Sequence, residues 1–140
     1  MSTQTDEIIT SLTQIPFIEG GRDENGCDCW GLVVVFYDKI FNKQLPFYGN
    51  VYYKNKENYN KTCSDINDIV DNEGLLKETT NPKFGDIVIL NVFGRPLHIG
   101  IIIDNTRIIH TGRNTGVVIE KLTGAKWKSR IMGYYTLITN

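Results

Sequence analysis

The sequence predicts a single α+β domain in which helices come first and an antiparallel sheet follows. The chain has 140 residues and is 41% apolar, which suits one compact core and is too little for two full domains. Its N-terminal half contains apolar stretches of helical length, whereas the part after Asn81-Pro82 consists of short β-rich runs separated by turn residues. Elements segregated in this way are typical of α+β domains.

The first predicted helix is short and amphipathic. Thr5 is a suitable N-cap for it, and Pro16 ends it. Gly20-Gly21 then begin a polar loop over residues 22–26, which leads the chain to Cys29.

The second predicted helix is central and buried. Residues 29–41 are almost all apolar, and Asp28 is a strong N-cap candidate. The β-branched and aromatic residues 33–37 favour a strand by propensity alone, but the length of the run and the cap favour a helix. Asn42 ends it.

The middle of the chain is predicted to be a loop and one more helix. Residues 46–60 are rich in Tyr, Asn and Lys and are typical of a loop. A helix follows that Ser64 can cap, with Ile66 and Ile69 facing inward and Gly74 at its end.

The C-terminal half is predicted to form an antiparallel meander. The strands are expected over residues 86–91, 98–104, 107–111, 116–120 and 131–138. We expect the central helix to cover one face of this sheet.

Composition excludes several classes of function. Fifteen basic and sixteen acidic residues leave a formal charge of −1, without the basic excess of a nucleic-acid binder. No apolar run is long enough to insert into a membrane, and the polar, acidic residues 1–7 do not resemble a secretory signal. We therefore expect synthesis in the cytoplasm and no nucleic-acid partner.

The three cysteines are expected to be free thiols. Cys27 and Cys29 are too close in sequence for an ordinary disulfide. A Cys-x-Cys pair with two histidines also suggests zinc, but the spacing matches no usual paired-ligand pattern, so we expect no metal and no cofactor.

Cys29 is placed where a helix can activate it. The first turn of a helix offers unpaired N–H groups and the positive end of the dipole, which stabilise a thiolate. The same groups can hold the oxyanion formed when a thiolate attacks an amide carbonyl. A free cysteine is more often a small buried hydrophobe, and this simpler interpretation is retained for Cys27 and Cys63.

The two histidines lie on neighbouring predicted strands, and the turn between them decides whether they meet. If the turn is Asp104-Asn105-Thr106, Gly100 pairs with His110, and His98 and His110 are diagonal neighbours on one face. A two-residue turn places them on opposite faces. In the favourable register His98 is the base for Cys29, and His110 orients its imidazole, which gives a Cys29-His98-His110 triad.

Four segments resemble the NlpC-type cell-wall cysteine peptidases, the papain-like family that also includes the protein called p-sixty. Asp28-Cys29-Trp30-Gly31-Leu32-Val33 is similar to the nucleophile motif of this family. Phe84-Gly85-Asp86-Ile87-Val88 is similar to its strand-opening segment, His98-Ile99-Gly100-Ile101 to its base strand, and Ile109-His110 to its third catalytic position. The resemblance implies a papain-like fold with the nucleophile helix packed on the C-terminal sheet.

The resemblance also implies a substrate and a setting. Such enzymes cleave amide bonds in peptidoglycan stem peptides, typically between D-γ-glutamyl and the diamino acid that follows. Residues 20–32, with Trp30 where many members carry Ser, are most similar to the subset found in bacteriophage tails. This implies tail or tail-tip proteins as partners, and a protein made in the host cytoplasm and incorporated in the virion tail.

Five further residues are candidates for substrate binding. Asp28 is implied to bind the free amine of the stem peptide as well as to cap the helix. Phe17 stands where many members carry Tyr, whose hydroxyl is implied to act at the reacting carbonyl or to bind substrate, and Phe17 has no hydroxyl for either role. Arg22 and Asp23 are most simply a solvated loop, but they are also candidate walls of the cleft, and Trp30 is a core or groove-wall aromatic.

Two other functions remain compatible with the sequence. The chain can be a structural or assembly protein of a phage tail that keeps the peptidase fold with little activity, because fold does not imply function. It can also be an acyltransferase on the same scaffold, which would transfer the acyl group to an amine rather than to water.

Overall fold

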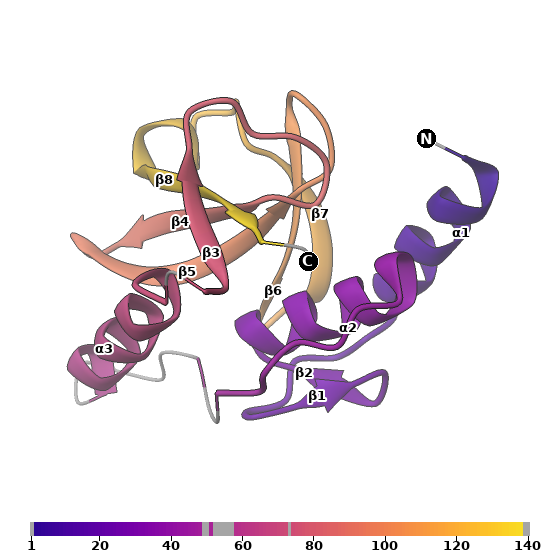
Figure 1. The fold of residues 1–140 in the computed structure, drawn as a ribbon, viewed down its shortest axis with the longest axis horizontal. Helices are drawn as coiled ribbons and strands as arrows, with labels where there is room; N and C mark the ends of the chain where they lie inside the picture. Colours follow the sequence, from indigo (N-terminus) through magenta and orange to yellow (C-terminus); the bar gives the residue numbers. More distant parts are fainter. Residues whose placement is uncertain (1, 49–50, 52–57, 73, 139–140) are drawn as a thin grey trace.

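The computed structural model describes residues 2–48, 51, 58–72 and 74–138, and it has the predicted α+β architecture. The helices of the described ranges are α1 (Thr3–Leu12), α2 (Cys29–Phe41), α3 (Tyr59–Val70) and the short 3-10 helix η2 (Lys128–Arg130). Figure 1 shows α2 beside β6, α1 next to α2, and α3 near β3 and β5. None of the helices described is both long and apolar enough to cross a membrane.

The main sheet contains six antiparallel strands in the order β3-β8-β4-β5-β6-β7. Their bounds are β3 (Leu76–Thr79), β4 (Ile87–Val92), β5 (Arg95–Ile102), β6 (Arg107–Gly112), β7 (Gly116–Lys121) and β8 (Ile131–Leu137). The predicted meander is confirmed from β4 to β7. It is wrong for the last strand, because β8 returns to pair with β4 and with β3, a strand that the sequence did not predict.

The central helix α2 is confirmed, together with its cap. Asp28 accepts a hydrogen bond from the N–H of Gly31 at 2.8 Å, and Asn42 ends the helix in the left-handed conformation at φ 51°. Every residue from 29 to 37 is buried. Burial against the rest of the core therefore outweighs the strand propensity of residues 33–37.

The other helices begin and end at different residues from those predicted. Ser2, not Thr5, caps α1, and its hydroxyl accepts from the N–H of Thr5 at 3.1 Å. Ser64 lies inside α3, which ends at Val70 rather than at Gly74. Part of the predicted loop over 46–60 lies outside the described residues.

The predicted polar loop before Cys29 contains a small hairpin, β1 (Arg22–Asp23) and β2 (Gly26–Cys27). This loop packs so closely on α2 that a Cβ at Gly31 would lie 2.0 Å from the carbonyl oxygen of Gly21. A glycine at this position lets the loop reach the helix start, so it helps to determine where the nucleophile lies.

The sheet has an apolar cluster on each face. Along β4, Ile87 and Ile89 join the cluster that contains the helices, while Val88 and Leu90 join a second cluster on the opposite face. Trp127, from the segment between β7 and β8, belongs to the second cluster. This alternation gives the sheet one face that packs on α1 and α2 and another that packs on Trp127, while α3 contributes side chains to both clusters.

Candidate active site

The start of α2 places Cys29 in a buried position against the sheet. Its side chain is 4% exposed, and the thiol donates to the carbonyl oxygen of Val51 with a sulfur–oxygen distance of 3.1 Å. Backbone N–H groups of Trp30 and Ile99 are also directed at the sulfur. Because Ile99 follows His98 on β5, this contact puts the thiol next to the strand that carries the predicted base.

The first turn of α2 has N–H groups available for a developing negative charge. The N–H of Gly31 donates to the side chain of Asp28, and the N–H of Leu32 donates to the backbone carbonyl of Asp28. The N–H of Trp30 is directed at the Cys29 sulfur, and that of Cys29 lies beside it at the positive end of the helix dipole. The helix start can therefore contribute to an oxyanion hole, as the sequence indicated.

The two histidines meet as the longer turn predicts. Ile101 pairs with Ile109 and Ile102 with Ile108, the register expected for a turn of three residues. Nε2 of His98 lies 2.7 Å from Nδ1 of His110, and both side chains are buried. The predicted contact between the histidines is confirmed.

A carboxylate that the sequence analysis missed completes this chain of contacts. Nε2 of His110 lies 3.1 Å from Oε1 of Glu120 on β7. The same carboxylate accepts from the indole N–H of Trp127 at 3.1 Å and lies 3.4 Å from the ammonium of Lys126. Trp127 stacks on the His98 ring, with centroids 5.7 Å apart.

The register of the next hairpin could have revealed Glu120. Gly112 pairs with Gly116 across another three-residue turn, so His110 pairs with Val118 and Ile108 with Glu120. Glu120 is therefore a diagonal neighbour of His110 on the same face. A three-residue turn at residues 113–115 implies this contact, just as the turn at residues 104–106 implies the contact between the histidines.

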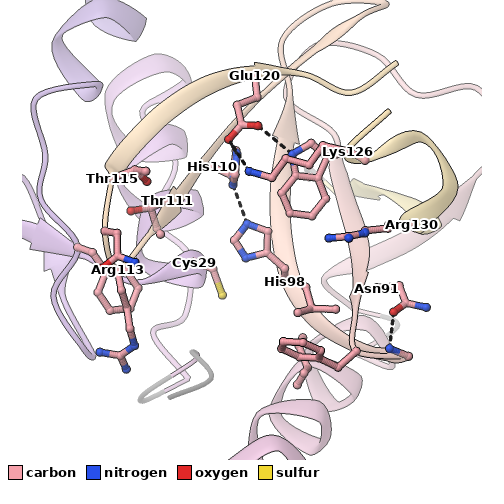
Figure 2. A pocket seen from close by; sticks show the side chains of 18 residues that line it. Cys29, Asn91, His98, His110, Thr111, Arg113, Thr115, Glu120, Lys126 and Arg130 are labelled. Atoms are coloured by element: carbon pink, nitrogen blue, oxygen red, sulfur yellow. Dashed lines mark hydrogen bonds and ion pairs between the residues drawn. The ribbon is translucent and has the colours of Figure 1, made fainter. Parts of the chain in front are cut away.

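These groups line one cleft of about 890 Å³ (Figure 2). Cys29, His98 and His110 contribute to its wall, with Phe17 and Trp127 among the aromatic side chains. Figure 2 shows Cys29 on one side of His98, with the dashed contacts running from His98 through His110 to Glu120. The structure thus brings the three predicted catalytic residues into one cavity.

Burial determines the protonation state of the thiol. It raises the pKa of Cys29 well above the ordinary value, and the carboxylate of Asp28 raises it further. The guanidinium of Arg22 and the two backbone N–H groups oppose this shift but do not outweigh it. Cys29 is therefore a neutral thiol at neutral pH in the free protein.

The histidines are also held in their neutral forms. Burial lowers the pKa of His98, and positive charge on His110 and Lys126 lowers it further. Burial lowers the pKa of His110 as well, although Glu120 opposes that shift. A neutral imidazole beside a neutral thiol is suited to general-base activation at the moment of attack rather than to a preformed ion pair.

The predicted substrate-binding residues are not all found in this cleft. Phe17 lines it, and the guanidinium carbon of Arg113 lies 5.0 Å from the centre of the Phe17 ring. Asp28, Trp30, Arg22 and Asp23 are absent from the cleft wall that the described residues form. Trp30 is fully buried and donates its indole N–H to the carbonyl of Pro46 at 2.7 Å.

Asp28 is buried, and its carboxylate accepts hydrogen bonds from groups of the protein itself. It is fully buried, and its carboxylate accepts from Arg22 at 2.6 Å and from backbone N–H groups of Gly20, Gly31 and Val51. With four protein donors it is already satisfied, and a substrate amine has no access to it. The expectation that Asp28 binds this amine does not fit the structure, because Arg22 and Gly31 donate to one carboxylate oxygen and the N–H groups of Gly20 and Val51 donate to the other.

Comparisons with known proteins place this arrangement in a family. The profile of the NlpC/P60 family matches residues 14–136, a range that contains Cys29, His98, His110 and Glu120. The chain belongs to the NlpC/P60 family. The expected family and its fold are thereby confirmed, and the fold is that of an NlpC/P60 domain.

Similar NlpC/P60 sequences occur in larger proteins. The probable peptidoglycan endopeptidase LytE of Bacillus subtilis is 29% identical over 124 residues, which are 88% of this chain and 30% of LytE. The probable endopeptidase NlpC of Escherichia coli is 29% identical over 115 residues, 81% of this chain and 63% of that protein. The chain thus spans less than two thirds of either relative.

Solved NlpC/P60 structures share the fold. The NlpC/p60 domain of the peptidoglycan hydrolase SagA aligns with 95% of this chain and 96% of its own, with a TM-score of 0.61 and 15% identity. The peptidoglycan hydrolase RipB from Mycobacterium tuberculosis aligns with 98% of this chain and 64% of its own, with a TM-score of 0.59 and 16% identity.

Proposed function

We propose that this NlpC/P60 domain is a cysteine endopeptidase that hydrolyses an amide bond in peptidoglycan stem peptides. The observation that carries the proposal is the position of Cys29 at a helix start, in the same cleft as the hydrogen-bonded pair His98 and His110. The relatives LytE and NlpC are described as endopeptidases, and LytE as a peptidoglycan endopeptidase.

The geometry supports a general-base mechanism. When a substrate carbonyl enters the cleft, the Cys29 thiol turns from Val51 to His98, which takes its proton as the sulfur attacks. The carbonyl oxygen becomes an oxyanion at the N–H groups of the first turn of α2. His98 then gives the proton to the leaving amine, and the C–N bond breaks to leave a thioester.

Hydrolysis of the thioester reverses these roles. Neutral His98 takes a proton from a water molecule, and the resulting hydroxide attacks the thioester carbonyl. The carbon–sulfur bond breaks, the proton on His98 returns to Cys29, and the product leaves as a carboxylic acid that gives its proton to the solvent. An acyltransferase would replace this water by an amine, so the fate of the thioester distinguishes the two reactions.

The charge of the cleft fits an acidic peptide. Arg113, Lys126 and Arg130 line it, and Glu120 is the one carboxylate among the described lining residues. An amide made through the γ-carboxyl of glutamate leaves the α-carboxylate free, and Arg130 is the most suitable partner for it, because Lys126 is paired with Glu120 and Arg113 with Glu19. This supports the bond between D-γ-glutamyl and the following diamino acid as the specific target.

We further propose that the domain acts as part of a bacteriophage tail. The support is the resemblance of residues 20–32, including Trp30, to the nucleophile segment of tail-associated members. The test is proteomic analysis of purified phage particles from a host that carries this gene. Recovery of the chain in intact particles supports the proposal, and its presence only in the soluble host fraction contradicts it.

The proposed activity is tested by mass spectrometry of soluble stem peptides after incubation with the wild-type protein and the Cys29→Ala variant. Fragment pairs should appear with the wild type alone, and their masses identify the bond cleaved. Cys63→Ala is the matched control, because Cys63 lies on α3 and does not line the cleft. Equal cleavage by wild type and Cys29→Ala would contradict the mechanism.

A structural or assembly protein of the tail is the alternative function. The buried thiol, with its raised pKa and its bond to Val51, favours this alternative, as does Phe17 in place of a hydroxyl-bearing residue. No cleavage of any stem peptide by folded protein, alone or within purified tails, would support it over the peptidase.

A further inference from the structure

We propose that Glu120 is a positioning residue that acts through His110 to hold His98 in the tautomer whose Nδ1 lone pair can accept the Cys29 proton. This inference rests on the proposed function, because it assigns a role within that site. It adds a fourth residue to the predicted triad and determines which nitrogen of each buried histidine carries a proton.

The direction follows from hydrogen-bond chemistry at Glu120. An ionised carboxylate can only accept, so the contact at 3.1 Å requires a proton on Nε2 of His110. In a neutral imidazole Nδ1 of His110 is then an acceptor. In the 2.7 Å hydrogen bond Nε2 of His98 is therefore the donor. Because a neutral imidazole carries one ring proton, Nδ1 of His98 has none.

The remaining contacts keep Glu120 ionised and in place. The indole N–H of Trp127 donates to its other oxygen at 3.1 Å, and Lys126 lies 3.4 Å from the oxygen that faces His110. Burial raises the pKa of Glu120, but these donors and the charge of His110 outweigh it, so the pKa is lowered overall. Trp127 also packs on both imidazole rings and limits their rotation.

The Glu120 carboxylate supplies a negative charge, which the neutral His110 lacks. During attack His98 becomes an imidazolium, and part of this positive charge can be shared along the contact to His110 and balanced by Glu120. The other charged or titratable groups around the histidine pair come from several elements. They are Cys29 on α2, Lys126 after β7, Arg130 on η2 and Arg113 in the β6–β7 turn.

Glu120→Gln tests the direction of the hydrogen bonds from His98 through His110 to residue 120 without a large change in the shape of that side chain. The oxygen of Gln would accept from Trp127, and its NH₂ group would then face His110 and donate to Nε2. This reverses both histidine tautomers and puts a proton on Nδ1 of His98. We expect kcat to fall roughly ten- to a hundredfold, the loss typical of residues that orient a functional side chain without touching the substrate. Glu120→Asp should cause a smaller loss.

The pH profile separates positioning from a purely structural role. Glu120 raises the pKa of His110, so its neutralisation should move the acidic limb of kcat/KM to lower pH. Lys126 lowers the pKa of both histidines, so Lys126→Met should move the same limb to higher pH. Opposite shifts are expected only if both charges act on the histidine pair.

Nitrogen-15 NMR of the imidazoles provides a readout that does not depend on activity. In the wild type we expect an Nε2–H tautomer for both histidines, and in Glu120→Gln an Nδ1–H tautomer for both. Unchanged tautomers in the variant, or equal kcat with an unshifted acidic limb, would overturn the inference. A wild type that shows the expected tautomers but cleaves no peptide would contradict the proposed function and leave this inference standing.

Discussion

Two carboxylates of this domain lie beside basic side chains, but their surroundings differ. Asp28 is fully buried and accepts four hydrogen bonds from the protein, one of them from Arg22. The Glu120 side chain is 28% exposed in the cleft and contacts His110. Asp28 therefore stabilises the helix start, whereas Glu120 contacts the histidine pair on one side and the solvent of the cleft on the other. The contacts of a carboxylate, not its residue type, decide between these roles.

The largest expected effect comes from breaking the buried pair. Asp28→Asn removes the charge that balances Arg22 and turns an NH₂ group toward some of the four donors. We expect a loss of about 3–5 kcal/mol in the free energy of unfolding, as for other buried ion pairs that lose one partner. Urea unfolding followed by circular dichroism measures it, and a loss under about 1 kcal/mol would refute the distinction between the two carboxylates.

Glu120→Gln is the matched change in the cleft. Because that carboxylate is partly exposed to water, we expect its unfolding free energy to change by less than about 1 kcal/mol. A loss as large as that of Asp28→Asn would show that Glu120 is mainly structural.

The next effect concerns Cys29, which follows Asp28 in the sequence and lines the same cleft as Glu120. Because burial raises its pKa, its alkylation by iodoacetamide should accelerate about tenfold per pH unit from neutral pH upward, in step with the thiolate fraction. Mass spectrometry of the Cys29 peptide against time gives the rate. A rate that is already constant between pH 6 and 8 would indicate a preformed thiolate–imidazolium pair instead.

A smaller effect is expected in the pH dependence of stability. His98 and His110 have lowered pKa values in the folded protein, so below their ordinary value of about 6.5 the unfolded chain binds more protons. Stability should therefore fall as the pH drops below about 6.5. The fall should be smaller in His98→Asn, and an equal fall in both proteins would argue against the buried histidines as its cause.

The smallest expected effect is on substrate affinity. Arg130 is exposed at the cleft, where its guanidinium carbon lies 5.6 Å from the centre of the Trp127 ring. Arg130→Ala should raise KM roughly two- to fivefold with kcat nearly unchanged, because an exposed ionic contact contributes about 1 kcal/mol or less. Arg107→Ala is the control, since Arg107 pairs with Asp104 away from the cleft. Equal KM values in both variants would exclude a substrate contact at Arg130.

Much of the site was predictable because its rules are local. The cap at Asp28 and the apolar run that follows predicted α2, and a three-residue turn predicted the contact between His98 and His110. Glu120 obeys the same rule, because the three-residue turn at residues 113–115 places it diagonally beside His110, although the sequence prediction did not include it. The N-cap of α1 was misplaced because Ser2 and Thr5 are both good caps and only the actual hydrogen bond distinguishes them.

The sequence by itself determined that helices precede the main sheet, where α2 starts and which register joins the histidines. Each depends on residues a few positions apart, whose backbone geometry a cap or a turn specifies. Only the tertiary structure decided that β8 pairs beside β4, that Asp28 is buried with Arg22, and that the Cys29 thiol bonds to Val51. The pairing of β8 with β4 and the Cys29–Val51 bond join segments far apart in the chain, and the burial of the Asp28–Arg22 pair depends on the segments packed around it. The packing of the whole domain therefore determines which groups meet and how much water reaches them.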